Sequence, residues 1–335
     1  MLLTGASGVV GRAVATELAG HRVIGLAHSD TNVPEVSEIL ACDLRVARLG
    51  LQEADWLRLA SEVDVIVHSG ALTVWGKPVD SYAAINIEGT RRVLELATLA
   101  RAPVYYVGTC FVHAIERGAM GRLAADNVVK PYIWSKLEAE KLLAQSGVPH
   151  SIFRPTNLLG NSRTGASLRP QIVQTMSDWI CRGKAPYFPM HRSNLVDVVP
   201  LDVLAVAIAQ AVERDDLGAL YWVTSGHQAM SAADALDILV PHAAALGRTI
   251  QRPPVVDPRD GLPIPLAEVP PLSRTFLKVL MDVSEVTHES GGVLPTSLPE
   301  MQERLAAPTF SDVDAYQRSL EYWASERGTP VGERA

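Results

Sequence analysis

Three glycines spaced three residues apart, Gly5, Gly8 and Gly11, lie at the start of the sequence and constrain its fold more than any other feature. They follow a short apolar run, 1–3, and precede a helical pattern over 11–19. Gly5 permits a tight turn, Gly8 lets the backbone approach a ligand, and Gly11 lets the helix pack close to the strand. Such a strand–turn–helix unit presents backbone N–H groups to a dinucleotide pyrophosphate. The residues predicted to hold that group are Gly5, Ser7, Gly8, Val9, Val10 and Gly11.

Apolar runs alternate with helical patterns over the first 159 residues. The run 63–68 is almost continuously apolar, which is typical of a parallel strand buried on both faces. The predicted strands span 1–3, 22–27, 39–43, 63–68, 103–108 and 150–154, and the predicted helices span 11–19, 57–60, 86–100 and 132–144. This alternation predicts an α/β fold built on a doubly wound parallel (Rossmann) sheet.

The alternation stops after the sixth predicted strand. Prolines crowd residues 253–271. Helical patterns span 168–182, 201–213, 231–246 and 312–325. Two late apolar runs, 195–199 and 219–223, are predicted to add strands to the sheet. We therefore predict a dinucleotide-binding domain over 1–159 and a smaller, mostly helical substrate-binding lobe over 160–335, interleaved with late strands of the sheet.

The net charge of −7 provides no electrostatic attraction to nucleic acid or to an anionic membrane. No apolar run reaches the roughly 18 residues that a membrane-spanning helix needs. The three cysteines, Cys42, Cys110 and Cys181, lie far apart without metal-ligand spacing, which predicts free thiols, no metal site and a reducing, cytoplasmic compartment. Met1 leads directly into the glycine-rich turn, so we expect no signal peptide. A homodimer is compatible with the sequence, which leaves the oligomeric state open.

Tyr132 and Lys136 lie four residues apart in one helical pattern, so both side chains are expected on the same face of that helix. There the ammonium is expected to lower the pKa of the phenol and prepare it for proton transfer. Thr109 directly follows the strand run 103–108, where its hydroxyl can bond a substrate carbonyl and the oxyanion that develops from it. Tyr132 and Lys136 are also predicted to contact the cofactor. Together with the dinucleotide turn, these three residues predict hydride transfer assisted by a tyrosine acid.

The end of the second predicted strand indicates which cofactor is bound. An acidic residue there would bind the adenosine 2′-hydroxyl of NAD. His28 and Ser29 occupy this position instead, with Arg12 expected nearby. A histidine and a serine can receive a 2′-phosphate, so NADPH is predicted in preference to NADH.

Two further strand ends are predicted to contact the cofactor, because open parallel sheets bind ligands at their carboxyl ends. Asp43 and Leu44 follow the third predicted strand, where the carboxylate can accept a hydrogen bond from the adenine amino group. Ser69, Gly70 and Ala71 follow the fourth, and their small side chains leave room for the cofactor ribose.

Asn86 begins the long helical pattern 86–100. It either braces the sheet and orders a water chain to the catalytic lysine, or only caps the helix. Pro155 fixes a turn after the sixth predicted strand. Backbone groups from Thr156 through Asn157 to Leu158 are therefore predicted to bond the nicotinamide carboxamide.

Four other side chains fall near these motifs. Cys110 follows the candidate catalytic threonine and is expected to be a small buried apolar residue. His113, His191 and Asp197 are polar residues within reach of a pocket, and each is expected to be an ordinary surface residue.

These residues together resemble the extended short-chain dehydrogenase/reductase superfamily. The resemblance covers the predicted dinucleotide domain and rests on TGASGVVG at 4–11, DL at 43–44, GA at 70–71, NIEGT at 86–90, Thr109, YIWSK at 132–136 and RPTNLLG at 154–160. Within the superfamily the chain is most similar to the thioester reductase domains that end nonribosomal peptide and polyketide assembly lines, and to carboxylic acid and fatty acyl-CoA reductases. The stretches that carry this similarity are RLGL at 48–51, Trp56, 63–71, 135–140, 160–165 and 197–202.

The resemblance implies that Thr109, Tyr132 and Lys136 form the catalytic set. NADPH would deliver hydride to a carrier- or CoA-bound acyl thioester entering from the C-terminal lobe, and the hemithioacetal would collapse to an aldehyde and a thiol. A second hydride would give the alcohol. His28 stands where an arginine often holds the NADP phosphate in this family. The chain shows no adenylation or carrier segment, so we expect a free-standing biosynthetic enzyme.

Other functions remain open on the sequence. A ketone or aldehyde reductase, or a hydroxysteroid-type dehydrogenase, would use the same three residues. A sugar-nucleotide epimerase would favour an acidic residue near position 27, and a dehydratase would favour an Asp-Glu pair where Cys110 and Phe111 stand. A dinucleotide-sensing binding protein without activity would usually lack the tyrosine or the lysine.

Overall fold

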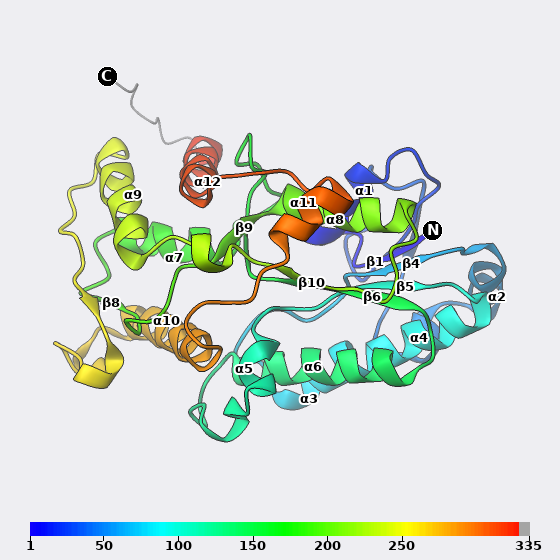
Figure 1. The fold of residues 1–335 in the computed structure, drawn as a ribbon, viewed down its shortest axis with the longest axis horizontal. Coiled ribbons are helices and arrows are strands. Elements are labelled where there is room, and N and C mark those ends of the chain that lie inside the picture. The colour runs from blue at the N-terminus through cyan, green and yellow to red at the C-terminus, as the bar shows by residue number, and fades with distance from the viewer. Residues whose placement is uncertain (328–335) are drawn as a thin grey trace.

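A seven-stranded sheet forms the centre of the computed structural model, which describes residues 1–327 (Figure 1). Residues 328–335 of the predicted substrate lobe lie outside the described residues. The strands of the sheet are β1 (Leu2–Thr4), β2 (Ile24–Ala27), β3 (Glu38–Ala41), β4 (Ile66–His68), β5 (Val104–Val107), β6 (His150–Pro155) and β10 (Leu220–Val223). They are all parallel and run in the order β10-β6-β5-β4-β1-β2-β3. The predicted doubly wound sheet is confirmed, and its strand order reverses between β1 and β4, where such sheets bind ligands.

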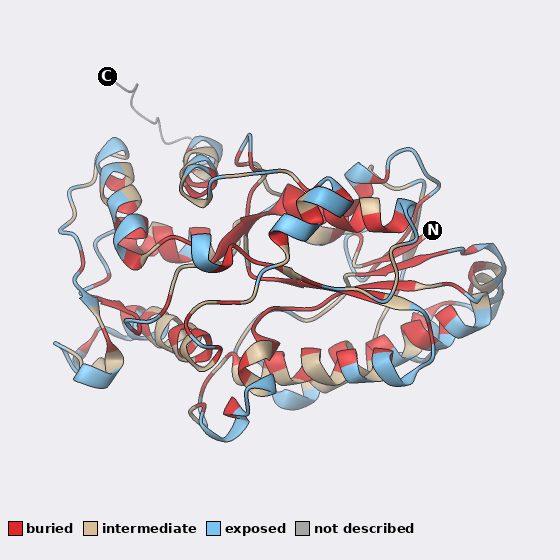
Figure 2. Ribbon diagram, in the orientation of Figure 1, coloured by how far each residue is buried: buried red, intermediate tan, exposed pale blue. Residues whose placement is uncertain are grey.

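Two layers of helices cover the sheet, one on each face (Figure 1). One layer contains α1 (Val9–Glu17), α8 (Leu201–Glu213) and α11 (Leu298–Leu305), and the other contains α2 (Glu53–Glu62), α3 (Val79–Tyr82), α4 (Glu88–Ala100), α5 (Val112–Glu116) and α6 (Lys130–Gln145). Successive strand residues point to opposite layers: Tyr105 packs in the core with α1 and α8, whereas Tyr106 packs in the core with α2 and α4. Figure 2 shows the result, a buried sheet between helices whose outer faces are exposed.

Four further helices enclose a separate core beside the sheet. They are α7 (Ile172–Cys181), α9 (Ala232–Ala245), α10 (Pro271–Glu289) and α12 (Asp312–Glu326). Trp179 of α7 stacks on Phe276 of α10, with ring centroids 4.9 Å apart. The short strands β8 (Phe188–Pro189) and β11 (Val255–Val256) pair in parallel beside them. The helices predicted near α7, α8, α9 and α12 are present, whereas the 19-residue α10 was not predicted.

One of the two late strands lies outside the main sheet. The run 219–223 joins it as β10, as predicted, and pairs with β6. The run 195–199 does not: β9 (Val198–Pro200) pairs instead with β7 (Asn157–Leu159) in a separate two-stranded ladder. In the main sheet the place beside β6 belongs to β10, whereas β9 pairs with β7, the segment that directly follows β6 in the chain.

None of the helices in the described part of the chain is both long enough and apolar enough to cross a membrane.

Candidate active site

The glycine-rich turn is built so closely that side chains are excluded from it. Gly5 has φ +69°, and a Cβ there would lie 2.7 Å from the Cα of Gly70. A Cβ on Gly11 would lie 2.1 Å from the carbonyl oxygen of Gly5. Gly8 is the N-cap of α1, and no side chain among the described residues caps that helix. The first-turn N–H groups, including those of Val9 and Val10, therefore suit an anion such as a pyrophosphate.

A buried histidine joins this turn to the loop after β4. The Thr4 hydroxyl lies 2.6 Å from Nδ1 of His68 and accepts from the Gly70 amide at 3.1 Å, while Ser69 Oγ donates to the Thr4 carbonyl at 2.7 Å. Burial lowers the pKa of His68 to about 3, so the ring is neutral. Thr90 already donates to a carbonyl of its own helix, so it accepts from His68 Nε2 at 3.1 Å. His68 Nδ1 consequently accepts from Thr4, which fixes the loop against the glycine-rich turn.

Asn86 lies inside a helix, so the interpretation of it as a helix cap is wrong. A π-helical turn, Ala83–Ile87, connects α3 to α4 and contains it. Its side-chain oxygen accepts from the Leu72 amide at 2.7 Å, and Nδ2 donates to the Leu72 carbonyl at 3.1 Å and to Ser135 Oγ at 2.9 Å. Asn86 therefore braces the loop after β4 against α6, and π-helical turns of this kind are frequent at functional sites.

The three predicted catalytic residues lie at the carboxyl end of β5 and on α6. Thr109 and Tyr132 are both buried, and their side chains lie close together. Burial raises the pKa of Tyr132, and the nearby Thr109 hydroxyl opposes that effect. Lys136 does not lower the pKa of Tyr132 as expected, because its Nζ donates to the Val107 carbonyl at 2.6 Å. Burial lowers the pKa of Lys136 to about 7.

A group of charges near Lys136 was not found from the sequence. Arg154 of β6 lies 2.5 Å from a carboxylate oxygen of Glu140 on α6 and 2.6 Å from one of Glu116 on α5. The side chains of Arg154 and Glu140 are only 4% and 5% exposed. Glu140 raises the pKa of Lys136 against the effect of burial. This group therefore links α6, the helix that carries Tyr132, to β6 of the sheet and to α5.

The predicted adenosine contacts converge because β2 and β3 are neighbours in the sheet. Arg45, which was not predicted from the sequence, lies between them: its Nη2 is 3.3 Å from His28 Nε2 and 2.7 Å from Asp43 Oδ2. The bond from Arg45 lowers the pKa of Asp43 to about 2. Arg12, expected near His28, pairs with Asp30 and with Glu35, each at 3.4 Å, and so holds the loop that follows His28. Leu44 approaches Gly70, since a Cβ on that glycine would lie 3.3 Å from its side chain.

In the segment after β6, several polar groups already form hydrogen bonds within the protein. The Thr156 amide donates to the Val223 carbonyl at 3.1 Å, so it is not free for a carboxamide. The side chains of Thr156 and Asn157 both donate to the Asp197 carbonyl, at 3.0 and 3.3 Å. Leu158 pairs with Val199 in the ladder between β7 and β9.

The expectation that Asp197 and His191 are ordinary surface residues is wrong. Asp197 is 5% exposed, and its oxygens accept from the Ser225 and Gly226 amides at 3.0 and 2.9 Å, while burial raises its pKa to about 7. His191 is buried and bonds Asp257 at 3.0 Å. Both are structural parts of the lobe because loops that look exposed in sequence fold beneath its helices.

The other two side chains near the motifs also have structural partners. His113 stacks edge-on against Trp222, with centroids 5.1 Å apart. Cys110 is fully buried, as predicted, and burial raises the pKa of its thiol.

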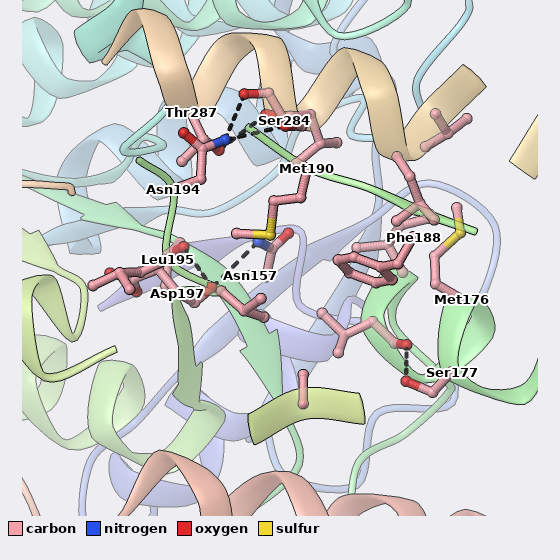
Figure 3. Close-up of a pocket in the computed structure, with 18 of the residues that line it drawn as sticks. Asn157, Met176, Ser177, Phe188, Met190, Asn194, Leu195, Asp197, Ser284 and Thr287 are labelled. Atoms are coloured by element: carbon pink, nitrogen blue, oxygen red, sulfur yellow. Dashed lines mark hydrogen bonds between the residues drawn. The ribbon is translucent and has the colours of Figure 1, made fainter. Parts of the chain in front are cut away.

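A cavity opens inside the lobe (Figure 3). Its lining comes from the segments 156–157 and 188–197 and from α7, α9, α10 and α12. Trp75 and Phe111 of the dinucleotide domain complete it on one side. Most of the lining side chains are aliphatic, aromatic or methionine. We call this space the lobe cavity; no sequence pattern indicated it, because its walls come from segments far apart along the chain.

Comparisons with known proteins agree with this architecture. The protein family described as "Male sterility protein" matches residues 24–208. The fusarin C synthetase of Gibberella moniliformis is 27% identical over 256 residues, which are 69% of this chain and 6% of that protein. The carboxylic acid reductase of Segniliparus rugosus is 31% identical over 209 residues, 55% of this chain and 18% of that protein. The chain thus spans only a small part of the curated relatives it matches.

Among solved structures, the terminal R domain from the myxalamid PKS-NRPS biosynthetic pathway has a similar fold. Its TM-score is 0.72 at 25% sequence identity, and the match covers 99% of this chain and 92% of that domain. The likeness therefore extends over the sheet and the lobe together.

Proposed function

Because this chain belongs to the male sterility protein family, within the extended short-chain dehydrogenase/reductase superfamily of NAD(P)-dependent oxidoreductases, we propose that it is an NADPH-dependent thioester reductase. The observation that carries the proposal is that Tyr132, beside Thr109, shares an apolar cluster with Phe111 and Leu294, and that both of these residues line the apolar cavity. The substrate would be an acyl thioester on a carrier protein or on CoA, and the first product an aldehyde. We propose that residues 1–159 bind the cofactor and that residues 160–335 bind the substrate.

The cofactor site fits a dinucleotide on its own geometry. The turn at Gly5 and Gly11 leaves space that a Cβ would fill, and the uncapped start of α1 offers N–H groups to the phosphates. When bound, NADPH supplies the hydride that reaches the substrate carbonyl carbon. Lys136, on the same helix as Tyr132, would hold the nicotinamide ribose, and Asn86 keeps the loop after β4 in place for the cofactor.

Tyr132 and Thr109 act on the carbonyl oxygen. Their hydroxyls donate hydrogen bonds to the oxygen as negative charge develops on it. Tyr132 then gives its proton to that oxygen, which suits a phenol whose raised pKa keeps it protonated at neutral pH. The carbon–sulfur bond of the hemithioacetal breaks next, with the hydroxyl proton leaving and the thiol taking up a proton. The sum is one thioester, one NADPH and one proton converted to one aldehyde, one thiol and NADP⁺.

A coupled assay tests the proposal. We expect the purified protein to oxidise NADPH when an acyl pantetheine thioester is added and to release one free thiol per NADPH consumed. Oxidation with aldehydes or ketones alone, and none with thioesters, would instead make it a simple carbonyl reductase. Cofactor retained through purification without any turnover would favour an epimerase or a dinucleotide-binding protein.

We further propose that Arg45 and His28 hold the 2′-phosphate of NADPH. Arg45→Ala is expected to raise the Kd for NADPH about 10- to 100-fold, because a charge-assisted hydrogen bond is lost, and to leave the Kd for NADH nearly unchanged. Titration calorimetry with both cofactors measures this. Arg91→Ala on α4, an exposed arginine paired with Glu88, is the matched control. An equal loss of affinity for both cofactors would show that Arg45 does not bind the 2′-phosphate.

A further inference from the structure

We infer that the lobe cavity binds the acyl group as an uncharged, mainly aliphatic chain, and that Ala235 on α9 limits the length of that chain. The inference rests on the proposed thioester reduction and adds the substrate class to it. Three features of the cavity support it: its connection to the catalytic tyrosine, the hydrogen bonds that its polar side chains already make, and the apolar side chains of its far wall.

The cavity begins where the catalytic tyrosine packs. Phe111 and Leu294 line it and belong to the same apolar cluster as Tyr132, with Trp75 packed against that cluster. Trp75 lies on the loop after β4, whose position is fixed because Tyr82 donates to the Val74 carbonyl at 2.7 Å. A thioester whose carbonyl reaches Tyr132 therefore has its acyl group directed into the lobe.

The polar side chains near the entrance are already engaged within the protein. Asp197 is the one ionisable carboxylate among the described lining residues, and both its oxygens accept backbone N–H groups. Asn157 donates to the Asp197 carbonyl, and Asn194 donates to the Ser284 carbonyl at 2.7 Å. No lysine, arginine or histidine lines the described part of the cavity. A charged group on the acyl chain would thus lose its hydration without gaining a partner, which is costly.

The far wall is apolar apart from one closed pair of hydroxyls. Ser177 of α7 donates to the Val173 carbonyl at 2.6 Å and lies 2.5 Å from the hydroxyl of Tyr316 on α12. In Figure 3, Ser177 and Met176 lie on the side of the cavity away from Asn157 and Asp197. Because Ser177 already donates, the Tyr316 hydroxyl donates to it, so both protons of the pair are used. The pair lies at the far end of the cavity, and neither hydroxyl has a proton left to donate to a charged group on the substrate.

Ala235 contributes the smallest side chain of the α9 wall. It is buried and lines the cavity beside Leu239 of the same helix. In Figure 1, α9 lies at the end of the molecule away from the sheet, so this wall is distant from the catalytic residues. The lining of the cavity thus runs from Phe111, which packs in the cluster of Tyr132, to Ala235 on α9, and this length suits a long acyl group. A larger side chain at Ala235 would therefore shorten the available space.

The first test compares pantetheine thioesters of butanoate, octanoate and dodecanoate with the thioester of 8-aminooctanoate. We expect kcat/KM to rise roughly threefold for each methylene group that enters the cavity. The terminal ammonium is expected to lower kcat/KM at least about a hundredfold relative to octanoate. Equal values for all four substrates would overturn the inference while leaving thioester reduction intact.

The second test changes the wall. Ala235→Leu is expected to lower the ratio of kcat/KM for dodecanoyl over butanoyl thioester about tenfold, since roughly two methylene groups no longer fit. Ala233→Leu, an exposed position on the same helix, is the matched control and should leave the ratio as it is. An unchanged ratio in a folded Ala235→Leu protein would contradict the length limit, and the wild-type series decides the question if that variant does not fold.

A binding measurement separates the two proposals. Titration calorimetry of dodecanoyl pantetheine into the NADP⁺-bound protein reports on the cavity whether or not reduction occurs. Tight binding of dodecanoyl over butanoyl thioester without turnover would support the acyl site and refute the proposed reaction. Absence of binding and of turnover would refute both.

Discussion

Replacing Tyr132 with phenylalanine is expected to lower kcat for thioester reduction by about two to four orders of magnitude and to leave NADPH binding nearly unchanged. The substitution removes only the hydroxyl beside Thr109, whereas the ring stays in its cluster, 6.3 Å from the ring of Tyr82. The proton and one of the two hydrogen bonds to the oxyanion are therefore lost together. Steady-state kinetics with a saturating thioester and a parallel titration of NADPH measure the two quantities.

Tyr105→Phe is the matched control for this variant. Tyr105 is a buried tyrosine of β5 that faces the opposite helix layer and donates to the Ala211 carbonyl at 3.0 Å. Its loss removes one phenol hydroxyl without touching the site, so kcat should stay within about twofold of wild type. Full activity in Tyr132→Phe would show that another group supplies the proton, and the mechanism proposed above would fall.

Replacing Arg154 with methionine is expected to lower the free energy of unfolding by about 3–5 kcal/mol. Methionine fills much of the space but leaves the buried carboxylate of Glu140 without its cation, which lies 2.5 Å away in the native protein. The arginine also stacks over Trp222, with its guanidinium carbon 4.6 Å from the ring centre. Urea unfolding followed by circular dichroism gives the change in unfolding free energy.

The pH dependence of this loss has a definite sign. Burial already raises the pKa of Glu140, and Arg154 is the main group opposing that shift. Without the arginine, folding favours the protonated carboxyl even more, so the folded state binds more protons than the unfolded one. The deficit should be largest at neutral pH and shrink as the pH falls through the raised pKa of Glu140. A loss no larger than that of Arg91→Met, an exposed and paired arginine, would contradict the role assigned to the buried group.

Most of the dinucleotide domain could be predicted because its signals are local. The apolar run 63–68 and the glycine turn each lie within one unit of structure, and the structure has them as β4 and the turn before α1. Tyr132 and Lys136 lie on one helix for the same reason. Their surroundings were not predictable from spacing alone: the pKa of Tyr132 is raised because Ile133, Phe111 and their neighbours close over it.

The parts that were missed depend on contacts between distant segments. Arg45 meets His28 only because β2 and β3 are adjacent, a relation that the sheet order would have revealed. The helix α10 was hidden by the prolines at 253–271, although Pro271 stands in its first turn, where proline is compatible with a helix. The run 195–199 was placed in the wrong sheet because its partner is β7, a short strand after β6 that was not predicted from the sequence.

The position of Tyr316 gives the lobe cavity an order of assembly. The glycine-rich turn, Thr109 and Tyr132 all precede α7, whereas the helix that carries Tyr316 is made after every other described element. Chains emerging from the ribosome fold their earlier parts first. In a nascent chain, the nucleotide-binding part would therefore be able to fold while the lobe cavity was still exposed to water. Selectivity for the proposed acyl group would therefore arise after the other described elements have been made, when α12 docks and Tyr316 reaches Ser177.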